Sequence, residues 1–188
     1  MDVFSHGLWS AAIYKGANIK AKQRMKIWRA VLFGVFPDVF SFAPLFIWLF
    51  GGLIFSYTSF SDFPNPNTTE PARQDTLLIF KITSLLYNFS HSLFAFVIIF
   101  GIVYLIFKRP VWEILAWLFH ILIDIPTHSY KFYPTPFLWP VSDFKFDGFL
   151  WSEPWFMILN YSALIIVFIL LRKNKINLIF KLKNIFLK

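Results

Sequence analysis

Apolar residues are gathered into one short run and four long runs along the chain. The short run is Val3–Tyr14, and the long runs are Ala30–Tyr57, Leu77–Phe107, Val111–Thr127 and Trp155–Leu171. A helix needs about 20 apolar residues to cross about 30 Å of hydrocarbon at 1.5 Å per residue. The pattern therefore predicts an all-α integral membrane protein with about four transmembrane helices. The short first run predicts an additional N-terminal helix that is interfacial or re-entrant.

The basic residues predict on which side of the membrane each connection lies, because short cytoplasmic loops carry an excess of Lys and Arg. The connections rich in Lys and Arg are the segment 15–29, the Lys108-Arg109 turn and the C-terminal tail 172–188. The loops 58–76 and 129–154 instead carry more acidic than basic side chains. We therefore expect one membrane-embedded helical domain, residues 1–188, in the cell inner membrane. Both termini are expected in the cytoplasm and the two acidic loops outside.

The composition of the chain also indicates a lipid environment. The 188 residues are 57% hydrophobic, 22% aromatic and only 15% charged, whereas soluble domains carry about 25% charged residues. The formal net charge is +8, but the basic clusters adjoin apolar runs, where they contact anionic headgroups rather than nucleic acid. The absence of cysteine excludes disulfides, thiolate metal sites and cysteine nucleophiles. Membrane lipids are the expected partners, and the oligomeric state is left open.

A set of ionisable residues lies within or beside the apolar runs. They are His6, His91, His120, His128, Asp2, Asp38 and Asp124. An Asp near the bilayer centre costs at least about 2.5–3.5 kcal/mol, so we expect these groups to pair with one another or to bind something. His120 and Asp124 are four residues apart and so share one helix face. Asp2 and His6 have the same spacing.

Histidine and aspartate side chains from separate helices are the means by which helical bundles build metal sites. Imidazole together with carboxylate suits zinc, manganese or non-haem iron, and the predicted cofactor is a divalent metal ion with zinc as the default. His120 and His128 would lie about 12 Å apart along an ideal helix. The spacing therefore favours two ions, or one ion beside a catalytic His128, over one ion held by both.

Structural explanations compete with a metal site. His120 and Asp124 would also form a hydrogen-bonded pair that only stabilises the bundle. Asp38 follows Pro37, so it would serve as the N-cap of a helix that starts within the run. His91 would make an isolated interhelical hydrogen bond. The Pro- and aromatic-rich loop 129–154 either folds back over the helix ends, where it could close a site, or anchors the chain at the interface.

Several short motifs, taken in order, resemble those of a known family. They are Asp2-x3-His6, Phe36-Pro37-Asp38, Ser90-His91-Ser92, His120-x3-Asp124-x2-Thr127 and Leu138-Trp139-Pro140. Together they resemble the bacterial family of inner-membrane metal-dependent hydrolases, which includes the LexA-regulated membrane-bound hydrolases. The resemblance extends from Asp2 to about Trp155. It implies a metal site formed by His6, Asp38, His91, His120 and Asp124.

The chain departs from the family pattern at two positions. Phe40 stands where a second Asp is frequent, and Leu86-Tyr87 stands where a His-Arg pair is frequent. His128 is a candidate substitute ligand for these missing groups.

The leading hypothesis for function is a membrane-embedded metal-dependent hydrolase. It would act on a lipid or lipid-linked ester, phosphoesters included, through a metal-activated water. Asp124 and His128 are the expected catalytic residues, with His128 as a general acid/base or a further ligand. A small membrane transporter or proton/metal conduit would use the same intramembrane residues as a relay. A non-catalytic membrane scaffold, in which the site only stabilises the bundle, is the third alternative.

Overall fold

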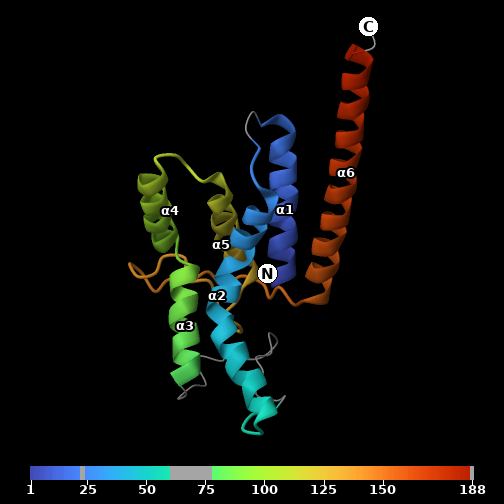
Figure 1. Ribbon diagram of the computed structural model, residues 1–188. Helices are drawn as coiled ribbons and strands as arrows, with labels where there is room; N and C mark the ends of the chain where they lie inside the picture. Colours follow the sequence, from blue (N-terminus) through green and yellow to red (C-terminus); the bar gives the residue numbers. More distant parts are fainter. Residues whose placement is uncertain (22–23, 60–77, 187–188) are drawn as a thin grey trace.

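The computed structural model describes residues 1–21, 24–59 and 78–186, with side chains as far as Lys173. The described chain is helical, and its elements follow one another as α1 (Val3–Lys20), α2 (Ile27–Ile54), α3 (Leu78–Ser90), α4 (Leu93–Phe107), the 3₁₀ turn η3 (Trp112–Ile114), α5 (Leu115–Thr127) and α6 (Pro154–Phe186). The predicted all-α class is thus confirmed for these residues. Helix α2 runs through the centre and packs against α1, α3 and α5, while α6 lies along α1 at one edge (Figure 1).

Among the described residues, the structure contains two helices able to cross a membrane, or three spans if one bent helix pair counts as one. Helix α2 and the Pro154–Lys173 part of α6 are long and apolar enough. Helices α3 and α4 would make a third span if taken together, but the chain bends by 63° between them. Helix α5 has 13 residues, so it reaches only about 20 Å. Two or three candidate spans are therefore shown, and the four spans and their orientation stay predictions.

The second long apolar run, Leu77–Phe107, is not one straight helix, because the helix breaks at His91. Helix α3 ends at Ser90 and α4 begins at Leu93 with Ser92 as its N-cap, whose side chain accepts a hydrogen bond from the Ala95 amide. A serine at an N-cap satisfies a backbone N–H that a new helix leaves unpaired. The break is tied to other elements, since the Trp117 indole donates to the Ser90 carbonyl at 2.6 Å. It places His91 in a turn rather than on a helix face.

Three further expectations are corrected at the helix ends. Helix α2 passes through Pro37 without interruption, so Asp38 is inside the helix and is not its N-cap. The first helix does not stop at Tyr14 but continues to Lys20. Residues 15–20 and 27–29 of the basic segment are therefore helical, and the described part of the tail 172–188 continues α6 as far as Phe186.

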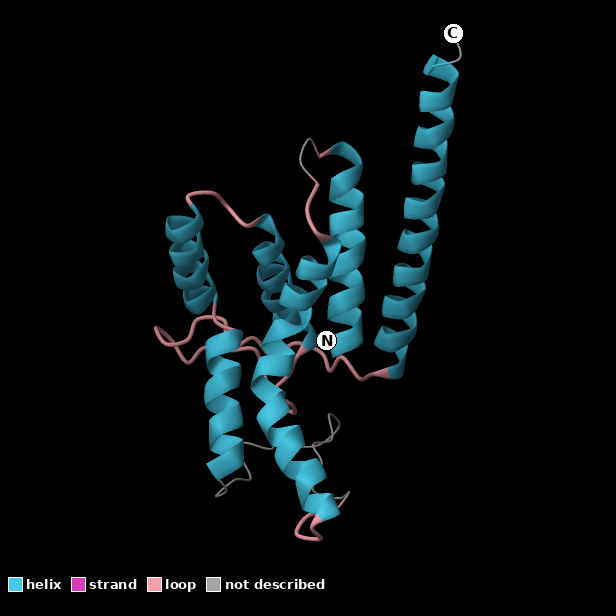
Figure 2. Ribbon diagram, in the orientation of Figure 1, coloured by secondary structure: helices cyan, strands magenta, loops and turns pink. Residues whose placement is uncertain are grey.

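The loop between α5 and α6 folds back across the helix ends, as one of the two readings of its sequence predicts (Figure 2). Residues 132–136 of this loop are buried, including the completely buried Tyr133. The Leu93 amide donates to the Phe137 carbonyl at 3.0 Å, which joins the loop to the start of α4. On the return path the Gly148 amide donates to the His128 carbonyl at 2.9 Å. The loop thus packs directly against the end of α5.

Candidate metal centre

Four of the predicted residues converge at the centre of the bundle. Asp38 comes from the middle of α2, His91 from the turn between α3 and α4, and His120 and Asp124 from successive turns of α5. One ligand atom from each side chain lies within 4.8 Å of the others, and all four residues are buried. Segments separated by up to 86 residues therefore contribute to one group of histidines and carboxylates.

The two imidazoles of this group face each other. His91 Nε2 and His120 Nε2 are 3.1 Å apart. Asp124 Oδ2 lies 3.0 Å from His120 Nε2 and 3.5 Å from His91 Nε2. Asp38 Oδ1 is more distant, at 3.6 Å from His120 Nε2 and 3.7 Å from His91 Nε2. His91, His120 and Asp124 therefore form the tighter part of the group, with Asp38 beside it.

The hydrogen bonds on the outer side of each ring assign the tautomers. His120 Nδ1 lies 2.7 Å from the carbonyl oxygen of Gly34. His91 Nδ1 lies 3.1 Å from the carbonyl oxygen of Tyr87 and 2.9 Å from the Ser90 hydroxyl. A carbonyl can only accept, so the ring proton of each neutral imidazole belongs on Nδ1. Both Nε2 atoms are then acceptors, and their lone pairs point toward one another.

This arrangement brings acceptors together without a donor between them. Among the described residues, the buried oxygens Asp38 Oδ2 and Asp124 Oδ2 have no hydrogen-bond partner. Buried polar atoms are normally paired, because an unpaired one loses its hydration without compensation. A cation among the two Nε2 atoms, Asp124 Oδ2 and the Asp38 carboxylate would have a ligand atom of all four residues within reach. Metal-bound histidines commonly donate their other ring N–H to a backbone carbonyl, as both rings do here, so these residues fit a divalent metal ion.

His6 lies beside this group, next to the second carboxylate oxygen of Asp124, Oδ1. Its ring stacks on that of His120, with the centroids 3.6 Å apart and the planes 22° from parallel. His6 Nε2 is 2.9 Å from Asp124 Oδ1, although the alignment is too poor for a hydrogen bond. The predicted pairing of Asp2 with His6 does not occur. Asp2 is instead the N-cap of α1, and its carboxylate accepts hydrogen bonds from Ser5 and from the Tyr161 hydroxyl.

His128 also reaches Asp124, from just beyond the end of α5. Its backbone is extended, with φ −120° and ψ 151°, so the ideal-helix spacing to His120 does not apply to it. His128 Nδ1 donates to the Tyr133 carbonyl at 2.8 Å, which leaves Nε2 as an acceptor 3.6 Å from Asp124 Oδ1. The Met1 nitrogen lies 2.9 Å from the same Nε2 and also contacts Asp124 Oδ1.

Several groups in the site carry no signal in the sequence. The Gly34 and Tyr133 carbonyls orient two of the histidines, and any residue type could supply them. Tyr87 occupies one of the positions that depart from the family pattern. Its ring stacks on His91 at 3.8 Å, and its hydroxyl donates to the Tyr133 carbonyl at 2.9 Å. The aromatic residue therefore supports the centre where a His-Arg pair was expected. In the loop after α5, Lys131 and Asp143 are exposed, and Ser142 and Lys145 are partly exposed.

Asn160 on α6 positions the end of α1 that carries His6. Its side-chain NH₂ donates to Ser5 Oγ at 2.7 Å, and its oxygen accepts from the Trp9 indole at 2.8 Å. Replacing Asn160 with Ala is expected to lower the free energy of unfolding by about 0.6–1.7 kcal/mol, the range of interhelical hydrogen bonds in membranes. A double-mutant cycle with Trp9→Phe in detergent would measure the coupling. Additive effects would show that the indole bond contributes nothing.

Comparisons of the chain with protein-family models, with curated proteins and with solved structures found no match. The resemblance to inner-membrane hydrolases therefore rests on the motifs of the sequence alone. The functional argument depends on the geometry of the buried His/Asp group.

Proposed function

We propose that this protein is a membrane-embedded metal-dependent hydrolase that cleaves a lipid or lipid-linked ester, phosphoesters included. The observation that supports this most is the convergence of two imidazole Nε2 lone pairs on two buried carboxylates. The motifs resemble those of inner-membrane metal-dependent hydrolases, and the candidate spans support a site at membrane depth. A substrate that reaches such a site most readily is a lipid of the inner membrane, in which we place the chain with four spans and cytoplasmic termini.

The donor set favours zinc among the divalent ions, because zinc binds imidazole and carboxylate in compact sites. His91, His120 and Asp124 would hold the ion, with Asp38 and His6 beside it. A divalent ion in this position supplies Lewis acidity and lowers the pKa of a water bound to it toward about 7.

His128 is the residue best placed to move a proton. Its Nδ1–H is engaged by the Tyr133 carbonyl, so Nε2, which the Met1 ammonium contacts at 2.9 Å, is the ring atom that would accept a proton from that side and return it. Asp124 lies between His128 and the imidazoles of the metal group. In this role it would orient the ion on one side and stabilise a protonated His128 on the other.

We expect chelation to abolish hydrolysis of lipid esters or phosphoesters by the purified protein, and zinc or manganese to restore it. His128→Gln should lower kcat by at least about 100-fold, the range of a general acid/base, while the metal content stays unchanged. Ser129→Ala serves as the neighbouring control. Turnover that survives complete chelation would contradict the proposal. Metal binding without turnover, but with ion flux in proteoliposomes, would identify a conduit instead; metal binding with neither would identify a scaffold.

A further inference from the structure

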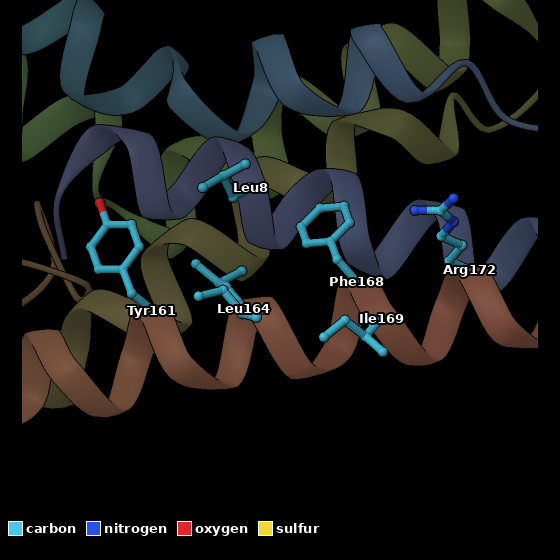
Figure 3. A pocket seen from close by; sticks show the side chains of 7 residues that line it. Leu8, Tyr161, Leu164, Phe168, Ile169 and Arg172 are labelled. Atoms are coloured by element: carbon cyan, nitrogen blue, oxygen red, sulfur yellow. The ribbon is translucent and has the colours of Figure 1, made fainter.

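A groove between α1 and α6 lies away from the His/Asp group and is open at the surface. It encloses about 370 Å³, near the lower end of the range of about 300–1,000 Å³ for ligand sites. Figure 3 shows Tyr161 at one end and Arg172 at the other, with apolar side chains between them. Among these, Ile165 is 61% exposed and Ile169 is 50% exposed. A long apolar groove with one charged end is therefore exposed on the outer side of the bundle.

The two helices are kept side by side at both ends of the groove. Trp9 and Asn160 form the hydrogen bond already described near one end. Near the other end Gly16 faces Leu171, and a Cβ built at Gly16 would lie 3.6 Å from that side chain. Because these contacts hold α1 against α6, the groove is a feature of a packed helix pair and does not depend on one mobile side chain.

The charged end of the groove carries two cations from different helices. Lys15 of α1 extends over the ring of Phe168 on α6, with Nζ 4.8 Å from the ring centroid. Phe168 and Arg172 are four residues apart and so lie on the same face of α6. Lys15, above Phe168, and Arg172, one helical turn further along α6, therefore bring two cations to the same end of the groove, which makes this end complementary to a phosphate.

The length of the groove matches one leaflet of a bilayer. Tyr161 and Arg172 are eleven residues apart, which is about 16 Å along a helix, and half of the hydrocarbon thickness is about 15 Å. Arg172 also lies at the end of the candidate span Pro154–Lys173, where a basic side chain meets the headgroups. An acyl chain that starts at Arg172 would therefore end near Tyr161, close to the bilayer centre.

We propose that this groove binds one anionic phospholipid of the leaflet on the basic side of the protein. The phosphate lies at Arg172 and Lys15, and one acyl chain lies between α1 and α6. This site is separate from the proposed metal centre and does not depend on hydrolysis.

The test is native mass spectrometry of the purified protein titrated with phosphatidylglycerol or phosphatidylcholine. We expect wild type to prefer phosphatidylglycerol, and Lys15→Gln/Arg172→Gln to weaken its binding about 25-fold, or about fivefold for each cation. Ile165→Trp fills the groove from an exposed position and should weaken both lipids. The matched control is Lys108→Gln/Arg109→Gln, which removes two charges from the turn after α4. Thermal unfolding of each variant confirms that the fold is retained.

Three results would overturn the proposal. The first is equal binding of the two lipids by wild type, which would indicate nonspecific annular lipid. The second is an equal loss in the control variant, which would indicate a general charge effect. The third is crosslinking of Ile165 to a second copy of the chain with no lipid retained, which would show that the groove is a protein interface.

Discussion

Replacing His120 with alanine is expected to remove the divalent metal ion from the purified protein. The substitution deletes an Nε2 atom that lies 3.1 Å from His91 Nε2 and 3.0 Å from Asp124 Oδ2, at the centre of the group. It also removes the His120 Nδ1–H group, which donates a hydrogen bond to the Gly34 carbonyl. Loss of groups outside the ligand shell lowers metal affinity by 10–100-fold. We therefore expect a loss of more than about 100-fold for His120→Ala.

The measurement is elemental analysis of the detergent-purified protein after dialysis against a buffered zinc solution. Asp124→Asn should behave like His120→Ala, since it removes a charge that faces both imidazoles. Asp143→Asn is the matched control, because Asp143 is exposed on the loop between α5 and α6. His120→Asn keeps a polar side chain in the same place and guards against simple unfolding. If the folded His120 and Asp124 variants kept their zinc, the metal would lie elsewhere in the protein. If wild type bound no zinc, His120 and Asp124 would be only a hydrogen-bonded pair that stabilises the bundle.

Replacing Gly148 with alanine is expected to destabilise the protein more than any other glycine-to-alanine change in the described helices and loops. A Cβ at this position would lie 2.2 Å from the Pro126 carbonyl oxygen and 2.7 Å from that of His128. Both are backbone atoms, so no side-chain rotation relieves the overlap. The same loop segment is held by two backbone hydrogen bonds, from the Gly148 amide to the His128 carbonyl and from the Phe149 amide to the Pro126 carbonyl. Overpacking and the loss of these bonds together cost about 2–4 kcal/mol.

The free energy of unfolding can be measured in mixed micelles by titration with a denaturing detergent, followed by circular dichroism. Gly101→Ala is the matched control, because no atom lies within 4 Å of a Cβ built there. Alanine in the interior of α4 should be neutral or stabilising by up to about 1 kcal/mol. The Gly148 variant should also weaken the contact of His128 with Asp124, since the loop holds both His128 backbone and side chain. If the Gly148→Ala and Gly101→Ala variants were equally stable, the close contact of the loop at Gly148 with the end of α5 would not be what positions His128.

Part of the candidate site follows from local sequence. His120 and Asp124 are on one helix face because they are four residues apart, and the structure confirms both the helix and the contact between the two side chains. The clustering of Asp38 and His91 with this pair also agrees with the prediction. These residues were identifiable because a His or Asp in an apolar run is costly wherever the run packs. That they bind a metal stays a prediction.

Other features depend on contacts that the local sequence does not encode. The run Leu77–Phe107 does not reveal the break at His91, because it is mostly apolar and the serines that end one helix and cap the next are also tolerated inside helices. Because Pro37 precedes Asp38, the sequence offers Asp38 as the N-cap of a new helix. Packing against α1, α3 and α5 instead keeps α2 continuous through both residues. Asp2 looked like a partner of His6 from its spacing. A capping bond to Ser5 and a contact from Tyr161, far along the chain, direct it elsewhere.

The sequence by itself determined the helical class, the lipid environment and the identity of the polar side chains that must be satisfied there. Each of these depends on residue type and near neighbours, so each can be read along the chain. Only the tertiary structure decided that two Nε2 atoms face each other across a pair of carboxylates. That orientation depends on backbone carbonyls at Gly34 and Tyr87 and on the turn that carries His91. Every residue has such a carbonyl, and folding alone selects the ones that meet a histidine ring.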